Sequence, residues 1–134
     1  MRRWWSLPLV VAAVLPVSAC SSDKAETCEE AFTAAASSVD GVASAEWDCS
    51  FQFGGGWVRG DVVLAANTED EAVAVMEDLL RAFAASPDLE DSWSTPQQYG
   101  TEDGSITVSV ADLKAFNGVP NVGEVREHYG ITPG

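Results

Sequence analysis

Few residues in this chain have the types and spacing that catalysis requires. Its single histidine, His128, lies near the C-terminus beside Glu127 and Tyr129. One histidine cannot supply the multi-histidine ligand sets of catalytic zinc sites. Serines are frequent, but no Gly-x-Ser-x-Gly turn exposes one as a nucleophile. We therefore expect no enzymatic activity, and we interpret His128 as a surface residue in the last turn of a helix, where a cation suits the helix dipole.

Carboxylates are the most abundant functional groups, with 21 Asp and Glu residues in 134. In so acidic a chain, two neighbouring carboxylates carry little information. The densest loop cluster is Asp88, Glu90 and Asp91, whose oxygens suit a weak Ca²⁺ site, although no EF-hand pattern surrounds them. A solvated acidic loop is the simpler interpretation, so we expect no cofactor or metal. A hydrolase that uses two carboxylates brought together by the fold stays open as a third alternative.

The sequence predicts a binding surface at Trp57 and Arg59. They follow Gly54 to Gly56, which lack the lysine and the strand-to-helix setting of a phosphate loop and instead suit a hairpin turn. An aromatic residue beside such a turn can bind a sugar ring, a peptide or a partner protein. The alternative is that Trp57 folds back over the edge of the sheet and serves packing alone.

The N-terminus has the order of an export signal. Met1 to Arg3 are positively charged, Leu7 to Val17 are mostly apolar, and small residues follow. The apolar run is too short to cross a membrane, which needs roughly 20 residues. We expect a leader that is removed from the mature chain.

The sequence Val17-Ser18-Ala19-Cys20 resembles the lipobox of bacterial lipoproteins. The resemblance implies that Cys20 carries a diacylglyceryl group and becomes the new N-terminus. Two or more acyl chains, such as palmitate, would hold the chain lastingly to the extracytoplasmic face of a cell membrane, or of an outer membrane if the organism has one. An ordinary secretory signal, with an incidental Cys20, is the alternative. The expected organisation is a signal peptide at 1–19, a lipidated cysteine with a short linker at 20–26, and one globular domain at 27–134.

The charge balance limits the partners. The full chain has a net charge of −14, and without Arg2 and Arg3 five basic residues face 21 acidic ones, a net charge of −16. Such a domain repels phosphate backbones and anionic lipid surfaces alike, so nucleic acid is not an expected partner. The apolar fraction of 46% is sufficient for a hydrophobic core.

Cys28 and Cys49 remain once Cys20 is set aside, and in an oxidising compartment this even pair predicts a disulfide bond. The pattern around each cysteine agrees. Residues 43–53 alternate between apolar and polar, which predicts a half-buried strand whose inner positions are Ala43, Ala45, Trp47, Cys49, Phe51 and Phe53. A helix from Thr27 to Gly41, with Thr27 as N-cap and Glu30 completing a capping box, places Cys28 on its apolar stripe. The first helix should therefore pack across the inner face of the first strand.

The remaining elements follow from capping and alternation. A strand at 58–66 returns antiparallel, and Gly60 within it indicates a bulge or a close backbone approach. A capping box of Thr68 and Glu71 opens the longest helix, which ends near Ala85. We expect a short edge strand at 93–99, a strand at 105–110, and a final helix capped by Asn121 and Glu124 that ends at Gly130.

These elements predict an α+β fold. It should be a two-layer sandwich in the order α-β-β-α-β-β-α, with helices on one face of an antiparallel sheet of about four strands. Combined with the anchor and the lack of catalytic groupings, it suggests a membrane-anchored, non-enzymatic interaction or accessory domain of the bacterial cell envelope. Its expected partners are the membrane, through Cys20, and an envelope protein or the cell wall. A carrier of a small apolar ligand or lipid is the alternative, and it would require an internal pocket.

Overall fold

The structure, a computed structural model, describes residues 20–52 and 56–134. Its elements are, in order, α1 (Cys20–Ser37), β1 (Val42–Ser50), β2 (Trp57–Leu64), α2 (Glu69–Ala85), β3 (Gln98–Thr101), β4 (Thr107–Ser109), the 3₁₀ helix η1 (Val110–Leu113) and α3 (Val122–Tyr129). The predicted α+β fold is confirmed, with one short 3₁₀ helix that was not expected. Among the described residues, none of the helices is both long enough and apolar enough to cross a bilayer.

The four strands form one sheet in the order β1-β2-β3-β4. β1 and β2 pair antiparallel along their whole length, whereas β2 and β3 pair parallel through only Val63 with Gly100 and Leu64 with Thr101. Parallel neighbours need a long crossover, and α2 supplies it. The predictions of a fully antiparallel sheet and of an edge strand at 93–99 are therefore wrong, because β3 lies inside the sheet between β2 and β4.

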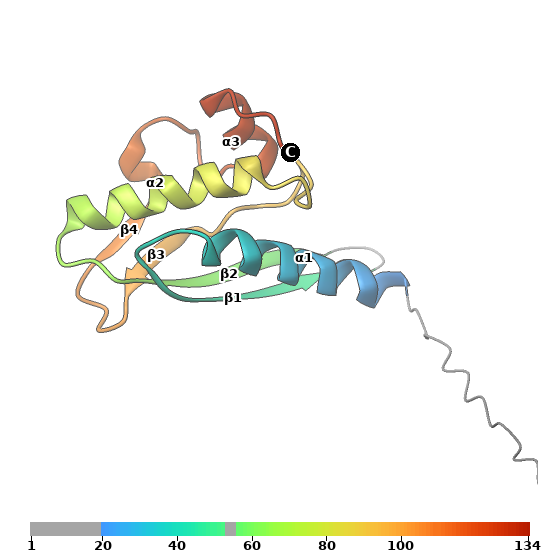
Figure 1. The fold of residues 1–134 in the computed structure, drawn as a ribbon, viewed down its shortest axis with the longest axis horizontal. Helices are drawn as coiled ribbons and strands as arrows, with labels where there is room; N and C mark the ends of the chain where they lie inside the picture. The colour runs from blue at the N-terminus through green and yellow to red at the C-terminus, as the bar shows by residue number, and fades with distance from the viewer. Residues whose placement is uncertain (1–19, 53–55) are drawn as a thin grey trace, which may run out of the picture.

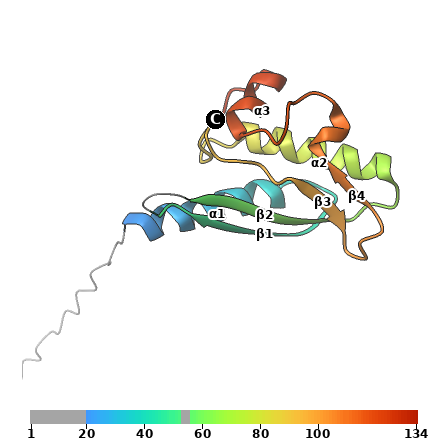
Figure 2. The same ribbon diagram turned by 180° about the vertical axis from the view of Figure 1, so that it is seen from behind.

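The helices lie on one side of the sheet (Figures 1 and 2). α1 packs on β1, α2 packs on β4, β3 and α1, and α3 packs on α2. The core between helices and sheet includes the fully buried Phe32, Phe83 and Tyr99. The opposite face of β1 and β2 carries exposed polar residues such as Glu46 and Asp61, so helices cover one face and solvent reaches the other.

Helix α1 begins earlier than predicted. Cys20 is already helical, so Thr27 lies within the helix and not at its N-cap. The short linker expected after Cys20, residues 21–26, is part of the helix. The segment contains no proline or glycine that would stop a helix. Tertiary contacts also hold it, since Ala25 packs against the core and the Lys24 Nζ lies 4.9 Å from the centre of the Phe51 ring.

The inner face of β1 is buried where the alternation predicts it, at Trp47 and Cys49. The strand is shorter than predicted and ends at Ser50, and Ala43 at its start is exposed. Phe51 follows the strand, partly buried against the core, where its ring stacks on that of Trp93 at 5.6 Å. The predicted inner position Phe53 lies outside the described residues.

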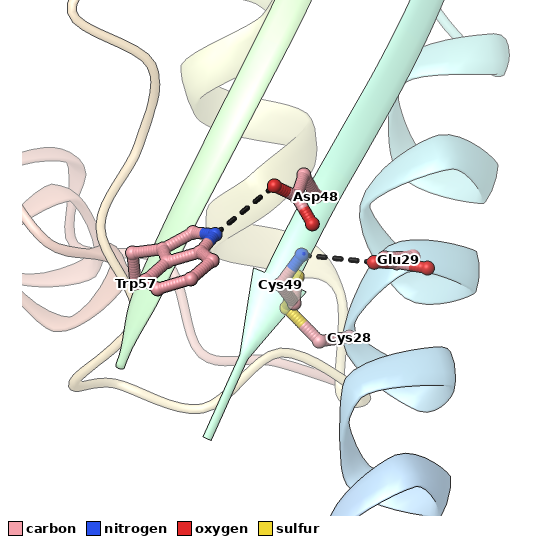
Figure 3. The surroundings of a disulfide bond; sticks show 5 residues. All are labelled: Cys28, Glu29, Asp48, Cys49 and Trp57. Carbon is pink, nitrogen blue, oxygen red and sulfur yellow. Dashed lines mark hydrogen bonds between the residues drawn. A yellow bond between two sulfur atoms is a disulfide. The ribbon is translucent and has the colours of Figure 1, made fainter. Parts of the chain in front are cut away.

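The disulfide bond between Cys28 and Cys49 joins α1 to β1, as predicted (Figure 3). The next residue of the helix, Glu29, accepts a hydrogen bond of 2.9 Å from the backbone N–H of Cys49. β1 is an edge strand with no further strand beside it, and the Glu29 carboxylate takes the place of a strand partner for this N–H. A loop of this size stabilises the fold by about 3 kcal/mol on the chain-entropy argument.

The helix caps agree with the sequence pattern at α2 and α3. The Thr68 side chain accepts from the Glu71 N–H, although the Glu71 carboxylate accepts from the N–H of Asn67 and not from that of Thr68. Asn121 and Glu124 form a complete capping box, and Gly130 ends α3 with a left-handed backbone at φ 64°.

Arg126 closes the C-terminal end of α2, a role that the sequence pattern does not reveal. Its guanidinium donates to the carbonyl oxygens of Ala84, Ser86 and Leu89 and to the carboxylate of Asp91. The final carbonyls of a helix have no partner within the helix, and a cation there suits the helix dipole. One side chain from α3 therefore holds both the end of α2 and the loop that follows it.

Gly60 allows the backbone of β2 to pack closely against the side chain of Trp47. The two residues are register partners on the inner face, and a Cβ atom at position 60 would lie 2.6 Å from the Trp47 ring and 2.9 Å from Pro96. The close backbone approach expected at this glycine is confirmed. The only register shift between β1 and β2 lies elsewhere, between Val42 and Ser44.

We expect Gly60→Ala to lower the free energy of unfolding by about 1–3 kcal/mol, because the added methyl group overpacks the space beside Trp47. Gly100→Ala is the matched control, since its Cβ would meet nothing closer than 3.5 Å. Urea unfolding of the two variants measures the difference. Equal stabilities would contradict this account of the contact.

Candidate functional site

The residues singled out by the sequence, Trp57 and Arg59, lie on the solvent face of β2, close to where the strand begins. In the register of the hairpin, Trp57 is opposite Ser50 and Arg59 is opposite Asp48. Trp57 is one of two exposed large hydrophobic residues of the described chain, with 40% of its surface accessible. We call Asp48, Trp57 and Arg59 the Trp57 surface.

Two interactions hold the indole ring in place. The Trp57 Nε1–H donates to the Asp48 carboxylate at 3.0 Å, diagonally across the two strands (Figure 3). The Arg59 guanidinium lies over the ring, 4.8 Å from its centre. The ring therefore lies on the outside of the hairpin with its polar edge bonded, and it does not enter the core. Of the two interpretations drawn from the sequence, the exposed platform agrees with this geometry better than packing over the sheet edge.

Two hollows open beside this surface, along the edge of β2 that β3 leaves unpaired. The smaller has a volume of about 280 Å³ and is lined by Lys24, Phe51, Gly56, Trp57, Val58, Ser92, Trp93 and Ser94. The larger, of about 580 Å³, lies between residues 58–61 and residues 95–98 and also reaches Val119. Both share Val58, so a groove with aromatic residues at one end runs along the first half of β2.

Lys24 connects this groove to α1. Its Nζ lies over the Phe51 ring at 4.9 Å and is 3.9 Å from the Glu90 carboxylate, an exposed and therefore weak ion pair. The smaller hollow thus contains a cation from α1, aromatic rings from the β1–β2 hairpin and from Trp93, and polar Ser92 and Ser94. Such a lining can hold an amphipathic partner, but it contains no pair of an acid and a nucleophile.

The other residues considered for chemistry do not come together. His128 is exposed, and its ring lies against the rings of Phe116 and Tyr129 at 4.8 and 4.6 Å. Asp91 is bonded to Arg126, while Glu90 faces Lys24. Among residues 20–52 and 56–134, no three His, Cys, Asp or Glu side chains are grouped as a metal ion requires.

Asp48 and Lys24 belong to the site although the sequence did not single them out. Asp48 could have been found from the hairpin register, because diagonal neighbours on one face of a strand pair lie within reach of a long side chain. Lys24 had no comparable signal, since its place depends on α1 being helical before Thr27. Cys20, where the lipobox resemblance predicts lipidation, is the first described residue of α1.

No protein-family model matches the chain, and no curated protein or solved structure is similar enough to be matched with it.

Among the residues that the structure describes, three side chains have clearly shifted pKa values. Burial raises the pKa of Tyr99 well above its usual value of 10, and the hydroxyl has no hydrogen-bond partner among the described residues. Burial, and the hydrogen bond that its hydroxyl donates to Glu77, raise the pKa of Tyr129 to about 12. At the β3–β4 turn, hydrogen bonds from Ser105 and Thr101 lower the pKa of Asp103.

The two tyrosines are the only ones in the chain, so their titration can be followed without interference. We expect no phenolate absorbance to develop near pH 10 while the protein is folded, and both tyrosines to titrate there in urea. Because the fold favours the protonated tyrosines, their contribution to the free energy of unfolding is complete below pH 10. It is lost progressively as the pH rises from 10 towards 12. Tyr129→Phe should weaken this fall. Ionisation of either tyrosine near pH 10 in the native protein would contradict the packing described.

Proposed function

We propose that this chain is a lipid-anchored, extracytoplasmic, non-enzymatic domain of the bacterial cell envelope, whose Trp57 surface binds another envelope component. The lipobox-like sequence at residues 17–20 supports the anchor. The exposed Trp57, fixed by Asp48 and Arg59 on a sheet face that no helix covers, is the observation that carries the binding role. Exposed aromatic and arginine side chains are the residue types that contribute most to binding at interfaces.

The packing of the interior favours an interaction domain over a carrier. Phe32 stacks on Trp47 at 5.0 Å, and Phe83 packs edge-on against both rings at 5.3 and 5.9 Å. These rings fill the centre of the two-layer sandwich, where a carrier would need space for its ligand. The groove along β2 opens at the surface, which suits a partner that docks from outside.

The distribution of basic residues also supports a binding role at this site. The expected mature chain has five basic residues. Arg126 and Arg81 pair with carboxylates on or beside α2. Lys24 and Arg59 border the groove, where Lys24 also forms its weak, exposed ion pair with Glu90. In a domain of net charge −16, this end of the hairpin is therefore a place where a partner can meet positive charge.

Trp57→Ala tests the binding role. Since the ring is exposed and packs on Arg59, we expect the free energy of unfolding in urea to fall by less than about 1 kcal/mol. Binding of the purified chain to washed envelope fragments should fall by about 30-fold, as for a central interface residue worth about 2 kcal/mol.

Trp57→Phe is the conservative variant for this measurement. It keeps the aromatic ring and should retain most of the binding. A loss of several kcal/mol of stability in Trp57→Ala, with binding unchanged, would show that the ring serves packing alone and would overturn the binding role.

A further inference from the structure

The first half of β2 has an edge with no strand paired to it. β3 pairs with β2 only from Val63 onwards, and residues 95–98 pass residues 58–61 without pairing with them. The hollow of about 580 Å³ lies between these two segments. Both the inner-face Gly60 and the outer-face Arg59 line it, so it follows the edge of the strand and not one face. The hollow therefore lies where a neighbouring strand would pair.

The backbone of β2 directs hydrogen-bonding groups towards this hollow. The N–H of Cys49 is bonded to Glu29 and not to β2, so Cys49 and Val58 form a non-hydrogen-bonded pair of the antiparallel ladder (Figure 3). Such pairs alternate with hydrogen-bonded ones, so Gly60, opposite Trp47, is in the same set. The N–H and C=O groups of Val58 and Gly60 therefore point away from β1. Within the described part of the chain, no strand pairs with them on that side.

The groove extends beyond this edge. Val58 also lines the hollow beside Trp57, whereas Gln97, Gln98 and Val119 also line a further hollow of about 240 Å³. Trp57 and Val119 are the two exposed large hydrophobic residues of the described chain, and both lie along this one groove. An occupant would therefore meet apolar side chains and exposed amide groups together with the unpaired backbone of β2.

A buried donor lies on the inner side of the same edge. The Trp47 Nε1–H has no hydrogen-bond partner among the described residues. It lies 2.7 Å from the point that a Cβ atom of Gly60 would occupy, and the Pro96 ring is 2.9 Å from that point. A buried donor without a partner is unfavourable. An occupant that carries acceptor oxygens therefore suits this edge better than a wholly apolar one.

The outer side of the groove carries one charge of each sign. Arg59 and Asp61 are both exposed and, being two residues apart in a strand, lie on the same face. Asp61 is opposite Glu46, and a basic residue of an occupant beside it would relieve this like-charge pair. An extended segment with an acidic and a basic residue two positions apart therefore complements the edge.

We propose that the unpaired edge of β2, residues 58–61, binds an extended segment of another protein by strand addition. The backbone of the segment pairs with Val58 and Gly60. Its alternate side chains are apolar on the inner side and charged on the outer side, beside Arg59 and Asp61. This inference rests on the proposed function and names the class of partner that the same groove receives.

Amide hydrogen exchange of the purified chain tests the edge itself. We expect the N–H groups of Val58 and Gly60 to exchange at least about tenfold faster than those of Arg59 and Asp61, which the alternation directs to β1. Equally slow exchange at all four positions would show that the edge is already protected, and it would overturn the inference.

The binding test uses the peptide Ac-Thr-Val-Glu-Val-Lys-Val-Thr-NH₂. When the peptide saturates the chain, exchange at Val58 and Gly60 should slow at least about tenfold. N-methylation supplies the matched control, because only one of the two alternating sets of peptide N–H groups can face β2. Methylating either the valines or the Glu and Lys residues should abolish binding, and methylating the other set should leave it. No slowing at millimolar peptide, or equal effects of both methylations, would overturn strand addition.

A charge swap tests the outer side of the groove. Asp61→Lys should weaken this peptide about fivefold and should instead favour the version with Glu in place of Lys. Since Asp61 is opposite Glu46, the new lysine should not destabilise the hairpin. Asp70→Lys, at the exposed start of α2, is the matched control and should not change the preference between the two peptides. The same preference in both variants would contradict the charge pairing.

Val58→Pro separates this inference from the proposed function. Proline lacks the N–H that Val58 directs towards the hollow, and the ladder with β1 does not use that group. Binding to washed envelope fragments should fall at least about tenfold in Val58→Pro, and it should also fall in Trp57→Ala. The N-methylated peptides carry the test if Val58→Pro does not fold.

The outcomes for the two variants differ. If Trp57→Ala loses binding and a folded Val58→Pro does not, the proposed function stands and strand addition is overturned. The partner would then be one that needs no backbone pairing, such as a cell-wall polysaccharide. If neither variant loses binding, both proposals fail.

Discussion

The disulfide bond between Cys28 and Cys49 is the constraint on which the rest of the arrangement depends. It joins a helix to the edge strand of the sheet, and Glu29 adds a hydrogen bond to the same strand residue. The join sets α1 across the inner face of β1, where Phe32 can stack on Trp47. The disulfide also lies between Cys20 and the sheet. An anchor at Cys20 would therefore be connected to the hairpin by a helix and a disulfide, with no flexible linker between them.

The aromatic interior of the domain stabilises the fold, whereas the outer face of the sheet is where a partner can bind. Stacked and edge-on aromatic rings fill the interior and stabilise the sandwich. A partner would therefore bind at the surface of the domain. On the outer face, Glu46 lies opposite Asp61, a like-charge pair that is unfavourable across strands. Among the described residues of this outer face, only the hairpin end presents an aromatic ring with a cation over it. The site that can bind a partner is therefore set by the register of two strands.

The sequence predicts those parts of the fold that local patterns determine. Alternation placed Trp47 and Cys49 inside, capping residues located α2 and α3, and Gly60 indicated a close contact. Alternation could not give the place of β3, which has only four residues and owes its position to the crossover through α2. The start of α1 was missed because Thr27 and Glu30 fit a capping box and equally the interior of a helix.

The site was predictable only in part for a similar reason. Trp57 and Arg59 stood out beside a glycine turn, but the partners that fix them come from another strand and from α1. Arg126 reaches carbonyls about 40 positions away in the sequence, and no local pattern indicates such a contact. Long-range pairing by polar side chains depends on packing that periodicity does not encode.

We propose that a lipidated Cys20 anchors this domain to a membrane and that the Cys28–Cys49 bridge joins the anchored helix to the sheet. Peptide mapping of the membrane-purified chain, alkylated without reduction, tests it most directly. The account predicts an N-terminal peptide that begins at an acylated Cys20 and a cross-linked pair of peptides containing Cys28 and Cys49. Alkylated Cys28 and Cys49, or a Cys20 peptide that lacks lipid and still carries the leader, would contradict it.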